Sequence, residues 1–132
     1  MNDKTVFTFF IHLRATPAWL ALSRPGRAAY VQEAVRPAFT SYPSVKARFF
    51  DAEAFTGRCS DVAMIETDDL RQYRFLIDAL RDEAFFGLPY FEVLEIIPAV
   101  EDGYVDYDRE TGLNAEAAIS PPARLRPGAV PA

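Results

Sequence analysis

The chain has 132 residues, of which half are hydrophobic and 14% are aromatic, and this composition predicts one domain with a sizeable core. The formal net charge of −5 argues against nonspecific binding to nucleic acid. The single cysteine, Cys59, excludes a disulfide framework within the chain and favours a reducing compartment. No signal peptide precedes the first strand, and no apolar run approaches the roughly 20 residues that span a bilayer, so we expect a cytoplasmic protein with no membrane partner.

The charges are unevenly distributed along the chain. Residues 1–60 hold eight Lys or Arg and four acids, whereas residues 61–110 hold four Arg and fourteen acids. Two solvated faces would explain this pattern, and so would complementary surfaces that meet in an oligomer.

Residues 4–15 alternate between an apolar face and a mixed face, which predicts the first strand. The apolar face should lie under helices, while the mixed face carries Phe10 and His12. Thr16-Pro17 then predicts a helix start, because the hydroxyl can cap free N–H groups and proline suits the first helical position. Trp19 lies on this short helix.

A longer helical pattern follows, with Ser23 as its predicted cap and Tyr42 near its end. Pro37 lies inside the pattern. Proline removes the hydrogen bond to the carbonyl of Glu33, so we expect a kink or an early end.

Residues 44–67 predict a hairpin of two strands. In the first strand, Lys46, Arg48 and Phe50 alternate with the residues of the opposite face. Thr56-Gly57 predicts the turn, because glycine can adopt a positive φ.

Thr67 is the predicted cap of a second long helix, whose apolar stripe runs from Leu70 to Leu80. Residues 90–100 predict the fourth strand. Strict alternation there places Leu94 and Ile96 on one face, and Pro98 favours an edge position or a strand end.

The end of the chain differs in composition from the rest. We expect residues 1–104 to form the domain and residues 105–132 to form a C-terminal extension that is extended or partly disordered. Residues 104–107 predict a short extra strand.

The acids Asp106, Asp108 and Glu110 imitate the start of a calcium loop. The positions that need glycine and an acid are occupied by Thr111 and Ala117, so we expect no metal site.

The order of the elements is β-α-β-β-α-β, which predicts an α+β, ferredoxin-like fold with an antiparallel sheet and both helices on one face. The other face would be uncovered. We expect it to be lined by Phe10, His12, Phe50, Met64 and Leu94. A second copy of the chain, packed sheet against sheet, would bury this surface in a homodimer with a cavity.

The string RFFDAEAF at residues 48–55, together with TPAWL at residues 16–20, resembles the darcynin family, a group of small bacterial and fungal proteins without a defined biochemical role. Weaker matches accompany these strings at residues 61–62, 66–70, 73, 80–82 and 91–93. The resemblance covers roughly residues 6–104, and it implies the fold of the dimeric α/β-barrel superfamily. That superfamily includes cofactor-free monooxygenases, polyketide cyclases, lactone isomerases and haem enzymes. The resemblance implies no catalytic residues.

Three polar residues are candidates for catalysis. His12, the only histidine, would serve as a general base, or else it is an ordinary strand residue. Arg48 and Glu66 should share a face on adjacent strands, where they would bind an anion or steady an enolate, or else form a cross-strand ion pair.

The remaining candidates are weaker. Asp51 and Glu53, two residues apart, would divide acid and base roles or else be solvated. Trp19 would stack on a flat substrate or else anchor the core. Substrate contacts are expected from Trp19 and four further residues: Phe10, Phe50, Met64 and Leu94.

Two functions follow as hypotheses. One is a small-molecule enzyme without a bound cofactor, which cyclises, isomerises or oxygenates a flat, aromatic or partly anionic substrate. The other is a non-catalytic binding or accessory protein that uses the same face. Haem ligation by His12 is a third and weaker hypothesis, which a Soret band would reveal.

Overall fold

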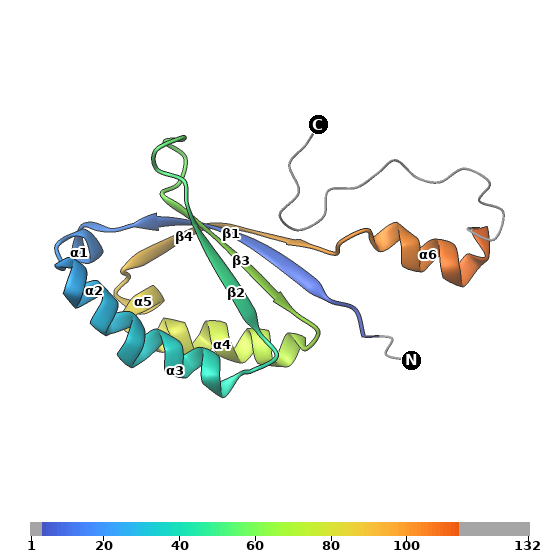
Figure 1. Ribbon diagram of the computed structural model, residues 1–132, viewed down its shortest axis with the longest axis horizontal. Helices are drawn as coiled ribbons and strands as arrows, with labels where there is room; N and C mark the ends of the chain where they lie inside the picture. The colour runs from blue at the N-terminus through green and yellow to red at the C-terminus, as the bar shows by residue number, and fades with distance from the viewer. Residues whose placement is uncertain (1–3, 114–132) are drawn as a thin grey trace. The chain divides into compact units, whose positions relative to one another are not determined.

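The structure is a computed structural model that describes residues 4–113, and its chain divides into two compact units, Met1–Glu101 and Asp102–Ala132. The first unit has the order strand, helix, two strands, helix, strand (Figure 1). Its strands are β1 (Phe7–Ala15), β2 (Lys46–Asp51), β3 (Asp61–Thr67) and β4 (Phe91–Ala99). Its helices are α1 (Pro17–Leu20), α2 (Arg24–Tyr30), the π-helical turn η1 (Val31–Val35), α3 (Arg36–Ser41), α4 (Leu70–Asp82) and α5 (Ala84–Gly87).

The described strands form one antiparallel sheet in the order β2-β3-β1-β4. This is the ferredoxin-like order, so the predicted fold is confirmed. β2 and β4 are the edge strands, and Pro98 near the end of β4 agrees with the expected edge position.

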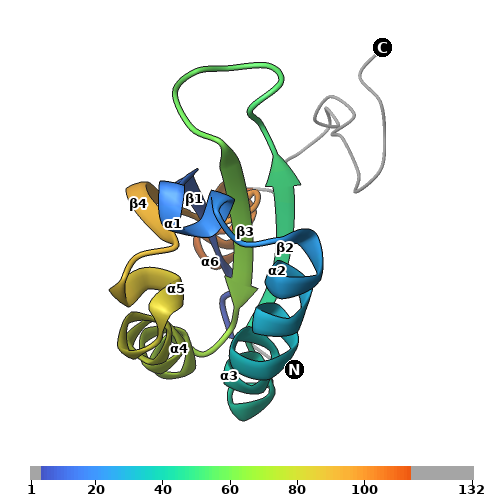
Figure 2. The same ribbon diagram turned by 90° about the vertical axis from the view of Figure 1, so that its left-hand side faces the viewer.

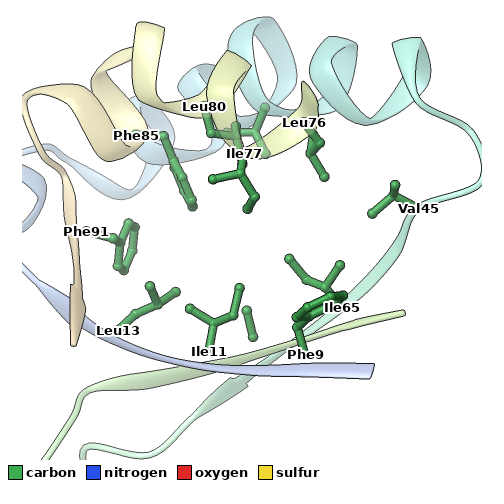
Figure 3. Close-up of a cluster of buried hydrophobic side chains, with 12 residues drawn as sticks. Phe9, Ile11, Leu13, Val45, Ile65, Leu76, Ile77, Leu80, Phe85 and Phe91 are labelled. Carbon is green, nitrogen blue, oxygen red and sulfur yellow. The ribbon is translucent and has the colours of Figure 1, made fainter. Parts of the chain in front are cut away.

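Both helical segments pack on the same side of the sheet, with α2, η1 and α3 beside α4 (Figures 1 and 2). The apolar residues of β1 point toward them, and Ile11 and Leu13 are almost completely buried. Figure 3 shows these side chains facing Leu76 and Phe85, which come from the helices. The hydrophobic core therefore lies between the sheet and the helices, as the alternation in β1 predicts.

The predicted helix starts at Thr16 and Ser23 are confirmed. The Thr16 hydroxyl accepts a hydrogen bond from the Trp19 N–H, and Ser23 does the same for Gly26. Pro37 does not end the helical segment, which continues through α3 to Ser41, but the chain forms the π-helical turn η1 just before it. In this turn the Arg36 N–H bonds to the Val31 carbonyl, five residues back.

Two predictions about local structure are wrong, one about a turn and one about a helix cap. The connection from β2 to β3 runs from residue 52 to residue 60 and is a longer loop than the predicted turn at Thr56-Gly57, and Gly57 does not adopt a positive φ. The α4 cap is Asp69, whose carboxylate accepts from the Gln72 N–H, and not Thr67. Thr67 is buried and bonds to Ser44 and to the backbone of Asp69.

The second unit contains helix α6 (Gly103–Thr111), so the predicted strand at residues 104–107 is wrong. The acids that imitate a calcium loop lie on this helix. A left-handed Gly112 ends it, as is common for helix C-termini. For residues 114–132, the expectation of an extended or partly disordered extension lies outside the described part of the chain. Within residues 4–113, no helix combines the length and apolar character that a membrane crossing requires.

Candidate functional site

The side of the sheet that faces away from the helices is the candidate site, and we call it the open face. Residues that pair directly across antiparallel strands share a face, so the register defines its members. They are Thr8, Phe10, His12 and Arg14 of β1, Lys46, Arg48 and Phe50 of β2, Val62, Met64 and Glu66 of β3, and Glu92, Glu95, Ile97 and Ala99 of β4. No helix of the described part of Met1–Glu101 covers this face (Figures 1 and 2).

The centre of the open face is apolar. One cross-strand row runs from Ile97 through Phe10 and Met64 to Arg48. Phe50 lies in the next row, and its side chain is 42% exposed, while that of Ile97 is 40% exposed. Large side chains at this exposure form an apolar patch that has no cover within its own domain.

A β-bulge in β4 changes one of the predicted faces. The register of β4 against β1 shifts between His12 and Leu13, so His12 pairs with Glu95 whereas Leu13 pairs with Val93. Leu94 is the extra residue of this bulge.

After the bulge, the residues of β4 no longer lie on the sides that a strict alternation counted from Glu92 would give them. Ile96 pairs with the buried Ile11 and belongs to the helix side, and Ile97 takes the place on the open face that the alternation assigned to Ile96.

His12 has a carboxylate partner that sequence reasoning missed. Its Nδ1 lies 4.0 Å from Glu95 Oε1, and its side chain is 34% exposed. At this distance the two groups are neighbours but do not share a hydrogen bond, which needs about 3 Å. The bulge creates this pairing, and alternation alone could not have revealed it.

Arg48 and Glu66 share the open face as predicted. The Arg48 guanidinium lies 5.1 Å from the centre of the Phe50 ring, which is within cation–π range. Glu66 pairs directly with Lys46, and both line a pocket at the end of the hairpin that also contains Asp68.

The three candidate catalytic residues do not form one hydrogen-bonded group. Strand spacing and rise place the Cα of His12 roughly 12 Å from that of Arg48 and roughly 14 Å from that of Glu66. Arg48 and Glu66 are diagonal neighbours. The arrangement can contact several parts of one flat molecule, but it does not assemble a base, its orienting partner and an anion-binding group at one bond.

Trp19 lies on the opposite side of the sheet from Phe10, Phe50 and Met64. Its ring is 4.9 Å from the ring of Phe91 and 5.3 Å from that of Tyr90, and it packs against the core. It also lines an apolar cavity between the sheet and the helices.

The predicted pair Asp51 and Glu53 is exposed, and Cys59 is buried. The carboxylate that Asp51 faces across the hairpin is Asp61. Burial raises the pKa of Asp61, the negative charges of Glu53 and Asp51 raise it further, and a hydrogen bond with Ser60 lowers it. Sequence reasoning missed Asp61, although its place in the hairpin register was the available signal.

Residues 4–113 contain no cluster of three or more His, Cys, Asp or Glu side chains that could hold a metal ion. His12 is the residue that could ligate a haem iron, and its ring nitrogen already faces Glu95.

A family profile described as Darcynin, domain of unknown function, matches residues 2–121. The chain belongs to the darcynin family. Darcynin 1 of Acinetobacter baumannii is 52% identical over 89 residues, which are 67% of this chain and 99% of that protein. A Darcynin homolog of Streptomyces avermitilis is 38% identical over 114 residues, which are 86% of this chain and 91% of the homolog.

Solved structures with this fold include chlorite dismutases. A mutant chlorite dismutase from Candidatus Nitrospira defluvii has a TM-score of 0.61 and 11% identity, over 75% of this chain and 41% of that one. Dimeric chlorite dismutase from Nitrobacter winogradskyi has a TM-score of 0.56 and 14% identity, over 74% of this chain and 58% of that one. The darcynin chain thus spans less than two thirds of either protein, and the likeness shows the dimeric α/β-barrel type of fold alone.

Proposed function

We propose that this darcynin binds a small, flat, partly anionic molecule on its open face, between two copies of the chain, without chemical conversion. The apolar row from Ile97 to Arg48 carries the proposal, because it combines a flat apolar surface with a cation at its end. Ligand sites typically join apolar walls to a few placed polar groups.

A second copy is the simplest cover for the open face. Leaving apolar surface in water costs about 25 cal/mol for each Å² that could be buried, and a self-complementary face suits a two-fold dimer. The structural neighbour from Nitrobacter winogradskyi is described as dimeric, which supports the same arrangement here.

The spread of His12, Arg48 and Glu66 over the open face favours binding over catalysis. Acid–base catalysis needs its groups within hydrogen-bonding reach of the reacting atoms. Arg48 suits the recognition of a carboxylate or another planar anion, because a guanidinium can donate two parallel hydrogen bonds.

Native mass spectrometry of the freshly purified protein, followed by titration with salicylate as a flat aromatic anion, tests the proposal. We expect a dimer and saturable binding of salicylate. Arg48→Gln should weaken that binding about tenfold or more, because it removes a charged hydrogen bond. Arg24→Gln, at an exposed position of α2, is the matched control. A monomer, or equal affinity in both variants, would contradict the proposal.

Cofactor-free catalysis is the second candidate, and the contact between His12 and Glu95 favours it. In this case His12 removes a proton from the bound molecule, beside the negative charge of Glu95. Replacement of His12, Arg48 and Glu66 together should abolish turnover and leave the dimer intact. Turnover of an identified substrate by the triple variant would exclude this role.

A further inference from the structure

A cavity of about 260 Å³ lies on the helix side of the sheet, across from the open face. Trp19, Phe85 and Phe91 line it, together with Val31 and Val35 of η1. Figure 3 shows the Phe85 ring pointing from its helix toward the sheet, near Phe91 of β4 and Leu13 of β1, which also line the cavity. These walls are apolar and mostly buried.

The exposed aromatic ring of Phe49 lies at the entrance of the cavity. Phe49 belongs to the helix side of β2, but its side chain is 53% exposed, and it lines both the cavity and a neighbouring groove along β2. An aromatic ring that remains in water at the entrance of an apolar cavity is a surface that a ligand would cover. A cavity of roughly 150 Å³ holds benzene, so this one has room for a molecule of one or two rings.

Asp61 is the polar side chain in the lining of this cavity. Its carboxylate is half-buried and faces Asp51 across the hairpin, with Glu53 also close enough to repel it. Like charges directly opposite each other in a sheet are destabilising. A cation placed between the cavity and these acids would remove the repulsion.

Two arginines in the surrounding segments donate to backbone carbonyls. Arg27 lies over the Trp19 ring at 5.9 Å and donates to the carbonyls of Trp19 and Leu20. Arg14 donates to the carbonyls of Gly57 and Arg58. The charges that act on Asp61 are those of the acids Glu53 and Asp51, so a complementary cation would come with a ligand.

We propose that this cavity binds a small aromatic amine, with its ring among Trp19, Phe85 and Phe91 and its ammonium group on Asp61. The aromatic walls suit both the ring and the positive charge, because ring faces attract cations. This site is independent of the open face.

The only tryptophan of the chain lines the cavity, so Trp19 fluorescence reports its occupancy. We expect a saturable fluorescence change with phenethylamine. The anion 3-phenylpropionate, which has the same ring and a similar length, should bind at least about tenfold more weakly, because it would face the acids. Asp61→Asn should weaken phenethylamine binding by about tenfold to a hundredfold.

Asp78→Asn makes the same charge change on an exposed position of α4 and should leave the affinity as it is. Val31→Phe fills the cavity from η1 and should remove binding without a change in charge. Equal affinities for the amine and the anion, undiminished binding by Asp61→Asn, or the absence of a saturable change in the unmodified protein would each overturn the proposal.

Discussion

Asp61 is a carboxyl group in unfavourable surroundings. Its pKa is raised above the ordinary value of 3.8, first by burial and then by the charges of Glu53 and Asp51, although the hydrogen bond with Ser60 opposes this. The folded protein therefore holds the Asp61 proton more tightly than the unfolded chain does. The resulting stabilisation is present below the ordinary pKa and is lost as the pH rises through the raised pKa.

Asp61→Asn should consequently be more stable than the unmodified protein at neutral pH, because it removes a half-buried negative charge. The difference in unfolding midpoint should shrink as the pH falls through the raised pKa and level off below about 3, where the carboxyl is protonated in both states. Thermal unfolding over a pH series measures this difference, with Asp78→Asn as the exposed control. A difference that does not change with pH would contradict the assignment.

At the scale of the element, side chains at the ends of helices decide where the helices begin. Asp69 holds the first turn of α4 through the Gln72 N–H at 3.1 Å, and its second carboxylate oxygen accepts from the Gln72 side chain at 3.2 Å. Thr67 was the expected cap, but its hydroxyl is used by Ser44 and by the backbone of Asp69. Thr67, Asp68 and Asp69 all have side chains that can cap a helix, and only the partners in the folded structure decide which of them does.

Asp69→Ala should lower the free energy of unfolding by about 1 kcal/mol, because it leaves the Gln72 N–H without its cap. Asp68→Ala removes the same charge one residue earlier and should have a smaller effect. Urea denaturation of both variants measures the two values. An equal loss in both would show that the charge near the helix start matters, and not the cap.

At the scale of the whole molecule, the open face carries opposite charges at its two edges. Lys46 and Arg48 lie on the β2 edge, whereas Glu95 lies on the β4 edge and Glu92 follows on the same side of β4. A two-fold axis parallel to the strands, between two stacked sheets, would place the β2 edge of each copy over the β4 edge of its partner. This alignment puts the basic edge of each copy against the acidic edge of its partner, with Arg48 one cross-strand row from Glu95, whereas a perpendicular axis would put like edges together.

Reversal of the charges on one edge, by Lys46→Glu with Arg48→Glu or by Glu92→Lys with Glu95→Lys, should weaken the proposed dimer by about tenfold or more. The chain that carries all four substitutions should regain most of the affinity, since the opposite charges face each other again. Sedimentation equilibrium at several concentrations measures the three dissociation constants. A dimer of the fourfold variant as weak as the others would exclude this alignment.

The sequence by itself determined the order of the elements, the apolar face of β1 and the caps at Thr16 and Ser23, because alternation, helical spacing and capping chemistry depend on residues that are close in the chain. It also pointed to the uncovered face and to the darcynin family. The bulge in β4, the contact between His12 and Glu95, and the cavity beside Asp61 depend on registers and packing between distant segments. Only the tertiary structure decided these features, since a shift of one residue in a strand changes which side chains share a face.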